Sequence, residues 1–447
     1  MGLFDRLRGD DDPRVAFVGV DGVPYSLLSE NRERFPNFAA LADEGSAGEI
    51  SSIVPPESSA CWPALTTGVN PGGTGVYGFQ DREIDSYETY VPMGRDVQAT
   101  RLWECVHDAD RNATVMNVPV TFPPERGVQR MVSGFLSPGV EEAAYPDDLR
   151  EYLERIDYRL DVTVTPSQDE DKSAFVADAR ETLAKRHEAF MHYIDKDDWD
   201  LFFGVYMTPD RINHFLFEDY ERDGPFRDEF LEFYRTLDSY IGEIREALPE
   251  DVTLVVASDH GFTTLAYEFD CNAWLKDAGW LSFRSDGDEL SDITDESRAY
   301  SLIPGRFYLN CEGREPRGCV TEEAFAETRR ELKAELKAIE GPEGNRVIDR
   351  VITREEAFRG DHTAIAPDLV AIANDGFDLK AGFPGNSIFS KGPRTGMHTF
   401  ADAALFVDDE RARIEDADLY DIAPTILSLL DIEYDRASFD GASVVKG

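Results

Sequence analysis

The sequence predicts an α/β fold, with a mostly parallel central sheet and helices on both of its faces. The first observation is a set of short apolar runs rich in Val, Ile and Phe, which are typical of strands buried on both faces. The second is that amphipathic, helix-like stretches such as residues 173–195 and 226–248 separate these runs. The apolar runs lie at residues 14–22, 113–119, 201–207, 252–261 and 368–374.

A change in sequence character indicates a second structural unit. After residue 263 the apolar runs give way to polar segments such as SDGDELSDITDES, followed by a strongly helix-favouring stretch at residues 324–339. We therefore predict one discontinuous α/β core, residues 14–263 and 366–443, with a cap insertion at residues 264–365. In open α/β sheets ligands bind at the C-terminal ends of the strands, so the polar residues that end the apolar runs are candidate site residues.

The chain is strongly acidic. Its 447 residues include 89 Asp or Glu and 45 Lys or Arg, a net charge of −44, yet 42% are hydrophobic, which is enough for a packed core. No basic segment stands out, so we do not expect nucleic-acid binding. Such a surface repels itself at low salt and is screened at about 1 M salt. We interpret the composition as adaptation to a high-salt cytosol; the alternative is an ordinary acidic protein.

Cysteine usage and the termini of the chain predict a cytoplasmic protein. No pair among the five cysteines has CxxC spacing, and we expect free thiols in a reducing compartment. The first residues, MGLFDRLRGDDDPR, contain no apolar signal-peptide segment, and no run of 18 apolar residues occurs. We therefore expect no transmembrane segment, and the sequence leaves the oligomeric state open.

Carboxylate and imidazole side chains follow several of the apolar runs. Each has an ordinary structural alternative: a helix N-cap for an aspartate, a surface pair for Asp210 and His214 at i, i+4, or a hydrogen-bonded core position for a histidine. Together they supply three Asp and three His at expected strand ends or in the loops that follow, which is enough for two metal ions with open positions. The six residues are Asp21, Asp210, His214, Asp259, His260 and His398.

A hydroxyl nucleophile is expected in the segment IVPPESSACWPALTTGVNPGGTG, residues 53–75. After two prolines, Ser58 or Ser59 begins a short predicted helix that runs to Thr67 and ends at Gly68. A helix N-terminus favours an anionic phosphate group. The alternative is that both serines only cap the helix.

Eight segments, taken in order, resemble the type I phosphodiesterase/nucleotide pyrophosphatase branch of the alkaline phosphatase superfamily. The similarity is greatest to its predicted phosphohydrolase or phosphomutase group, and it extends from about residue 14 to residue 443. The segments are VDG, PPESSACWPALTTGVNPGGTGVYGF, NVPVTFPP, PDRINHF, SDHGF, LNCEGREPRGCV, APDLV and GMHTF.

The resemblance implies a phosphate-ester hydrolase that acts on a small molecule and forms a phosphoserine intermediate. Ser58 falls on the family's nucleophile, which is usually Thr, and its oxygen is also expected to contact a metal; Ser59 is the fallback. Zinc is the favoured metal, and manganese also suits a mixed Asp/His ligand set. The resemblance implies two ligand sets: Asp210, His214 and His398 for one metal ion, and Asp21, Asp259 and His260 for the other.

The group that binds the non-bridging phosphate oxygen stays open. Phe79 stands where nucleotide pyrophosphatases carry a phosphate-binding Asn, which weakens any expectation of a nucleotide substrate. The candidates for this role are the Ser59 backbone N–H, Gln80 and Arg101.

Three alternative functions remain. A metal-dependent phosphomutase would use the same serine and metals. A sulfatase is disfavoured, because Cys61 and Pro63 match its C-x-P-x-R pattern but Leu65 replaces the arginine. A non-catalytic metal-binding scaffold would require a decayed site, whereas all six ligands and a hydroxyl are present.

Overall fold

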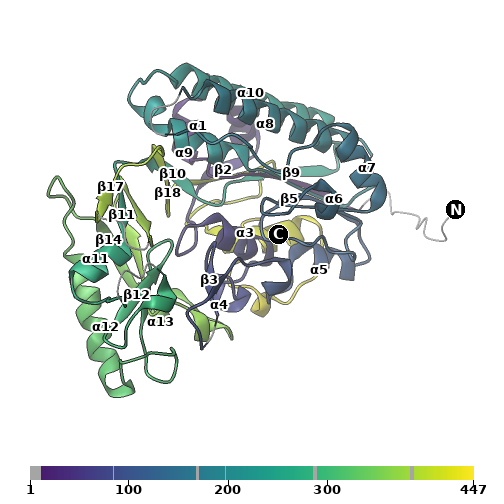
Figure 1. Ribbon diagram of the computed structural model, residues 1–447. Coiled ribbons are helices and arrows are strands. Elements are labelled where there is room, and N and C mark those ends of the chain that lie inside the picture. Colours follow the sequence, from purple (N-terminus) through teal and green to yellow (C-terminus); the bar gives the residue numbers. More distant parts are fainter. Residues whose placement is uncertain are drawn as a thin grey trace.

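The main sheet of the computed structural model forms the centre of the molecule (Figure 1). The structure describes residues 12–83, 85–167, 171–196, 198–284, 289–382 and 387–446. The sheet has eight strands in the order β2-β19-β9-β1-β8-β5-β6-β7. Strands β9, β1, β8, β5 and β6 run parallel, whereas β19 is antiparallel to β2 and β9, and β7 is antiparallel to β6. The strands are β1 (Arg14–Val20), β2 (Ser46–Ile50), β5 (Ala113–Val118), β6 (Arg130–Ser133), β7 (Ala144–Tyr145), β8 (Leu201–Tyr206), β9 (Val252–Ala257) and β19 (Ala403–Val407).

Alternate side chains of each central strand pack into two different cores, because successive side chains of a strand point to opposite faces of the sheet. In β1, Val18 packs with helices on one face of the sheet, whereas Phe17 packs with helices on the other. The first group is α1 (Tyr25–Glu30), α2 (Pro36–Glu44), α7 (Asp147–Arg155), α8 (Ser173–Ile194), α9 (Thr208–Glu221) and α10 (Arg227–Ala247). The second is α3 (Ser58–Thr67), α5 (Leu102–Asp108) and α14 (Ile422–Leu429). The predicted fold class is therefore confirmed.

A second lobe with its own apolar core lies beside the C-terminal ends of the parallel strands, at the lower left of Figure 1. One of its sheets has the order β12-β13-β15-β14, and the other the order β16-β11-β17. Its elements are β11 (Tyr267–Asp270), α11 (Cys271–Asp277), β12 (Ala299–Leu302), β13 (Arg306–Leu309), α12 (Glu322–Lys337), β14 (Ile348–Thr353), α13 (Arg354–Ala357), β15 (Leu369–Ala373), β16 (Phe377–Lys380) and β17 (Phe389–Ser390).

Short elements complete the fold. Two antiparallel two-stranded sheets occur: β3 (Asp81–Arg82) with β4 (Thr89–Tyr90), and β10 (Gly261–Thr264) with β18 (Gly396–Thr399). The remaining helices are α4 (Pro71–Thr74), α6 (Val140–Ala143) and five single 3₁₀ turns, η1 (Gly94–Asp96), η2 (Leu290–Asp292), η3 (Thr363–Ile365), η4 (Leu419–Asp421) and η5 (Arg436–Ser438).

One strand lies in a different sheet from the one predicted. The apolar run at residues 368–374 was expected in the main sheet, but it forms β15, which pairs with β13 and β14 of the second lobe. Strands β16 and β17 pair with β11 of the same lobe. The predicted boundary at residue 366 places β15, β16 and β17 in the core, whereas these strands pair within the sheets of the second lobe. A short apolar run indicates burial on both faces but does not reveal which sheet buries it.

Two other expectations concern the whole chain. All five cysteines are free thiols, as expected. Within the described ranges, no helix combines the length and the apolar character needed to cross a membrane.

Candidate active site

Five of the six candidate ligands follow three adjacent strands of the main sheet, and the sixth, His398, lies on β18. Because β9, β1 and β8 are neighbours and run parallel, their C-terminal ends lie side by side. Asp21 follows β1 directly, Asp259 and His260 follow β9, and Asp210 lies in the first turn of α9, which follows β8. Gly22 makes the turn after Asp21 possible, since its φ of 68° is in the left-handed region and the Cα of Asp210 would lie 3.3 Å from an added Cβ.

Three ligand atoms of one predicted set lie within hydrogen-bond distance of one another. The Nε2 atom of His398 is 3.1 Å from Asp210 Oδ1 and 3.1 Å from His214 Nε2. His214 Nε2 is 3.3 Å from the same Asp210 oxygen. His398 reaches this position because β18 pairs with β10, where His398 lies opposite Phe262.

The second predicted set lies next to the first. His260 Nε2 is 3.7 Å from Asp21 Oδ1 and 3.5 Å from Asp259 Oδ2. The imidazole of His260 also stacks on that of His398, with ring centroids 3.8 Å apart. Potential ligand atoms of Asp210, His260 and His398 lie within 4.8 Å of one another, as do those of Asp21, Asp259 and His260. His260 therefore joins the two sets into one continuous cluster.

Ser58 is the first residue of α3, and its hydroxyl faces this cluster. Ser58 Oγ is 3.2 Å from His260 Nε2 and 3.4 Å from Asp21 Oδ1. The Oγ atom of Ser59 is buried and has no hydrogen-bond partner among the described residues. Of the two serines that the sequence offered, Ser58 has the hydroxyl that contacts the candidate ligands.

Backbone carbonyl groups orient all three histidines of the cluster. The Nδ1 atoms of His214, His260 and His398 lie 3.2, 3.1 and 3.1 Å from the carbonyl oxygens of Gly396, Gly261 and Pro56. An Nδ1–H that donates to a carbonyl leaves Nε2 as the atom with a free lone pair, and this arrangement is common in metal-binding histidines. Each Nε2 points into the cluster.

Each of the three carboxylates is held by one oxygen while the other faces the cluster. Asp21 Oδ2 accepts a hydrogen bond of 2.7 Å from the indole Nε1 of Trp62. Asp210 Oδ2 accepts one of 2.9 Å from Arg211, and Asp259 Oδ1 accepts one of 3.1 Å from the backbone N–H of Gly22. The remaining oxygen, Asp259 Oδ2, is buried and has no hydrogen-bond partner within the described part of the chain.

The carboxylates of the cluster are buried and close together, so their negative charges are unfavourable without a cation. Asp21, Asp210 and Asp259 are at most 1% exposed. Burial, and after it the Asp259 and Asp210 carboxylates, raise the pKa of Asp21 well above its usual value. Burial raises the pKa of Asp259 to about 7. Burial would also raise the pKa of Asp210, but the neighbouring His214 and His398 side chains and the charge of Arg211 hold it well below its usual range.

The donor set fits divalent metal ions. Burial lowers the pKa values of His214 and His260, so both are neutral and their Nε2 lone pairs are available. Oxygen from Asp and nitrogen from His is the mixed donor set that zinc accepts. Positive charge placed between the buried carboxylates would relieve their repulsion and give the unpaired Asp259 oxygen a partner.

A cavity of about 1240 Å³ opens in front of the cluster, between the main sheet and the second lobe. Ser58, Asp210, His214 and His398 line it, together with side chains of both lobes. Leu136 also lines the cavity; its side chain is 47% exposed and its φ is 74°. An exposed leucine in the left-handed region is unusual, and such strain is found most often at functional sites.

One candidate role is wrong, and other neighbours of the site were not foreseen. Arg101 is buried away from the cavity, where it donates to the carbonyl oxygens of Gly94 and Val120. Arg211 was missed, although it follows Asp210 directly in the PDRINH segment. Trp62 is a buried core residue whose indole N–H also contacts Asp21, and no local signal in the sequence indicates that contact.

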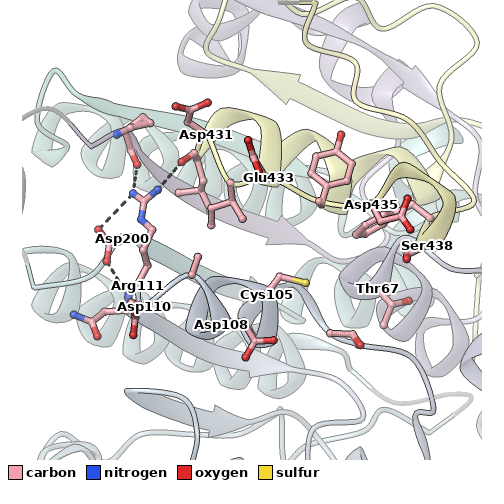
Figure 2. Close-up of a pocket in the computed structure, with 18 of the residues that line it drawn as sticks. Thr67, Cys105, Asp108, Asp110, Arg111, Asp200, Asp431, Glu433, Asp435 and Ser438 are labelled. Atoms are coloured by element: carbon pink, nitrogen blue, oxygen red, sulfur yellow. Dashed lines mark hydrogen bonds and ion pairs between the residues drawn. The ribbon is translucent and has the colours of Figure 1, made fainter.

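A second hollow, of about 1370 Å³, lies at the opposite edge of the sheet (Figure 2). Pro13, Asn112 and Asp200, which line it, immediately precede β1, β5 and β8, so it lies at the N-terminal ends of these strands. Arg111 donates there to the carbonyl of Leu430 at 2.5 Å. None of the candidate ligands lines this hollow.

Solved structures of phosphate- and phosphonate-cleaving enzymes share this fold. A phosphonoacetate hydrolase of Sinorhizobium meliloti 1021, crystallised with phosphonoformate, superposes with a TM-score of 0.62 at 16% identity, covering 94% of this chain and 96% of that one. The alkaline phosphatase PafA gives 0.59 at 14% identity, covering 98% and 100%. Murine ectonucleotide pyrophosphatase/phosphodiesterase 5 gives 0.56 at 14% identity, covering 94% and 95%. The fold is therefore alkaline phosphatase-like.

The sequence narrows this class to one family. A family model, described as type I phosphodiesterase/nucleotide pyrophosphatase, matches residues 15–400. The chain belongs to this family and is a hydrolase that acts on phosphate esters. No curated protein sequence matches it significantly.

Proposed function

We propose that this chain hydrolyses a small-molecule phosphate ester through Ser58, at a site that binds two divalent metal ions. Zinc is the favoured metal and manganese the alternative, because both accept mixed carboxylate and imidazole donors. Membership of the phosphodiesterase family supports a diester substrate. The proposed ligand sets are Asp210, His214 and His398 for one ion, and Asp21, Asp259, His260 and the Ser58 oxygen for the other.

The observation that carries the proposal is the position of the Ser58 hydroxyl. It lies 3.2 Å from His260 Nε2 and 3.4 Å from Asp21 Oδ1, two atoms that have the free lone pairs a metal ion requires. A serine hydroxyl is a weak nucleophile at its ordinary pKa and needs activation. When bound, divalent ions would lower the pKa of the hydroxyl and neutralise charge on the phosphoryl group.

The residues of the chain position and stabilise the reacting groups. Ser58 begins the ten-residue helix α3, so the positive end of the helix dipole is beside the oxygen that must become anionic. In the first step Ser58 Oγ gives up its proton and bonds to phosphorus, the ester P–O bond breaks, and the leaving oxygen keeps the electron pair and gains a proton, so that an alcohol is released. In the second step water attacks the phosphoserine, the Oγ–P bond breaks, and the serine hydroxyl is regenerated.

The proposal is tested by hydrolysis of bis-p-nitrophenyl phosphate and p-nitrophenyl phosphate in 2–3 M KCl, about the range that screens the acidic surface. Wild type, Ser58→Ala and Ser59→Ala are compared with zinc and with manganese. We expect Ser58→Ala to lower kcat at least about 1000-fold, since it removes the nucleophile. Ser59→Ala, the adjacent matched change, should keep most of the activity, and Asp259→Asn should lose both activity and one equivalent of metal.

Full activity of Ser58→Ala would contradict the proposed nucleophile. Mass spectrometry of the protein quenched with substrate should show a phosphoryl adduct on wild type that is absent from Ser58→Ala. Transfer of the phosphoryl group back to the substrate, with no release of inorganic phosphate or free monoester, would indicate a phosphomutase instead.

A further inference from the structure

Basic side chains gather in the cavity in front of the candidate metal centre. Five of its lining residues are basic and six are acidic, whereas the whole chain has 45 basic and 89 acidic residues. The hollow at the opposite edge of the sheet is lined by eight acidic residues and one arginine (Figure 2). The lining of the cavity is therefore less acidic than the chain as a whole and than the lining of the hollow. Its basic residues are Arg211, Arg346, Arg350, Lys380 and Arg394.

Three of these five cations are already engaged by neighbouring groups. Arg211 contacts Asp161 at 2.8 Å and Asp210 at 2.9 Å. Arg350 contacts Asp349 at 3.1 Å and lies over the ring of Phe400, 4.9 Å from its centroid. Lys380 forms a close ion pair with Asp378. These three side chains therefore already have partners within the protein.

The other two cations are available to a ligand. The side chain of Arg394 is 40% exposed, and among the described residues its only ion pair is a 3.9 Å contact with Asp378, which Lys380 already neutralises. Arg346 is exposed, and its guanidinium has no ion pair or hydrogen bond with any described side chain. Asp349 and Asp375 are the other carboxylates in this part of the lining.

Arg394 is fixed close to the candidate metal centre. The N–H of the next residue, Thr395, donates to the carbonyl of His214 at 2.7 Å, and the chain then enters β18, which carries His398. Burial lowers the pKa of His214, and the charge of Arg394 lowers it further, as expected for neighbouring groups. Arg346, by contrast, belongs to the second lobe, shortly before β14. The two guanidinium groups thus belong to different lobes that meet at the same cavity.

We propose that Arg394 and Arg346 bind a second anionic group of the substrate, a carboxylate or a phosphate carried by the part of the molecule that does not react. The inference rests on the proposed function, because it places the reacting phosphoryl group at Ser58. A guanidinium forms strong, paired hydrogen bonds with either kind of anion. A phosphate ester with an uncharged substituent would gain nothing from these residues, so they would select for a doubly anionic substrate.

Binding of matched phosphonates tests the inference without requiring turnover. Calorimetry with the zinc-loaded protein would compare 3-phosphonopropionate with propylphosphonate, which lacks the carboxylate, and with ethane-1,2-diphosphonate, which has a second phosphonate instead. We expect wild type to bind at least one of the doubly anionic compounds about 10-fold more tightly than propylphosphonate, as one charge-assisted hydrogen bond would produce. The compound that binds more tightly identifies the anion as carboxylate-like or phosphate-like.

Variants separate the two arginines from a general charge effect. Arg394→Ala and Arg346→Ala should each reduce the preference to about 1- to 3-fold, as loss of that bond predicts. Arg330→Ala is the matched control, because Arg330 lies on α12 of the same lobe, has a 77% exposed side chain and does not line the cavity. It should keep the full preference.

Equal binding of all three phosphonates to wild type would overturn the inference, as would a preference that survives in both cavity variants. If bis-p-nitrophenyl phosphate is cleaved in that case, the proposed function stands without the second anion site. If zinc-loaded wild type binds no phosphonate and cleaves no ester, the proposed function itself fails and the inference fails with it.

Discussion

Trp62 is both a core residue and a support for a candidate ligand. Its side chain is fully buried in the core between the sheet and α3, and its Nε1 donates to Asp21 Oδ2 at 2.7 Å. Gly19 makes room for the ring, since an added Cβ there would lie 2.4 Å from Trp62 Cη2. The hydrogen bond fixes the Asp21 carboxylate so that Oδ1 faces Ser58 and His260.

Replacing Trp62 by Phe should weaken metal binding while leaving the fold intact. The change keeps an aromatic ring in the core but removes the only N–H that holds Asp21 Oδ2 among the described residues. Loss of such an outer hydrogen bond typically costs about 10- to 100-fold in metal affinity. Zinc affinity, measured by competition with a chelator, should fall within this range.

The matched control is Trp199→Phe. Trp199 is equally buried, but its Nε1 donates to the carbonyl of Ile194 at the other end of the sheet. Zinc affinity should be unchanged in this variant. An equal loss of affinity in both variants would indicate general destabilisation and contradict the role given to the Trp62 N–H.

Asp418 should make stability depend on pH. Burial and the nearby Asp421 carboxylate raise the pKa of Asp418 to about 6, compared with about 3.9 for an unfolded aspartate. The folded state therefore binds the proton more tightly, and the free energy of unfolding decreases as pH rises from about 4 to about 6. Asp418→Asn removes this titration, and its amide oxygen can still accept from the Tyr420 N–H, which donates to Asp418 at 2.9 Å.

Urea unfolding at two pH values checks this prediction. At pH 8 the urea midpoint of Asp418→Asn should exceed that of wild type. At pH 4 this difference between variant and wild type should be smaller. Asp416→Asn is the control, because Asp416 is exposed and its φ of 55° is one that Asn tolerates. A difference between variant and wild type that is the same at both pH values would show that the Asp418 charge does not lower stability.

How far the site residues could be predicted depends on how local their signals are. Ser58 and the six Asp and His residues stand next to strand or helix ends, so topology alone brings them together. The contact of Trp62 with Asp21 and the exposure of Arg394 depend on packing between distant segments. The sequence alone contains no pattern that distinguishes them from ordinary core and surface residues.

At the scale of elements, helix α2 is capped by a residue of another helix. Phe35, at its N-cap position, offers no side-chain acceptor. Asp238, on α10, supplies it: Oδ1 accepts from the backbone N–H groups of Asn37 and Phe38 at 3.1 and 2.9 Å. Asp238 is only 2% exposed, so water could not take its place as the acceptor for these two N–H groups.

Asp238→Ala should therefore lower the free energy of unfolding by about 1–3 kcal/mol, since buried donors at a helix start lose their acceptor. Denaturation in urea, monitored by circular dichroism, measures the change. Glu246→Ala, an exposed position on the same helix, serves as the control and should shift stability by less than about 0.5 kcal/mol. Equal effects of the two substitutions would argue against capping in trans.

The elements themselves show what periodicity can and cannot predict. The helices expected at residues 173–195, 226–248 and 324–339 correspond to α8, α10 and α12, because long amphipathic patterns are distinctive. The runs that became β1, β5, β8 and β9 were also identified. β15 has the same composition as these strands, and only its antiparallel pairing with β13 and β14 assigns it to the second lobe.

At the scale of the whole molecule, the net charge of −44 should make stability depend on salt. Repulsion between surface carboxylates acts over about 10 Å at 0.1 M salt and about 3 Å at 1 M. We expect the Tm of the metal-free protein to rise by several degrees between 0.1 and 2 M KCl. Sorbitol at equal osmolality is the control, because it strengthens burial without screening charge. A Tm that rises equally in sorbitol would contradict charge screening as the cause.

The acidic hollow and the less acidic cavity lie at opposite ends of the parallel strands. Their lining residues differ in net charge, so the local electrostatic potential is more negative at the hollow than at the cavity. A doubly anionic substrate of the kind inferred above is therefore repelled less at the cavity than at the hollow. The residues at the edge remote from Ser58 thereby influence which collisions are productive, although none of them contacts the substrate.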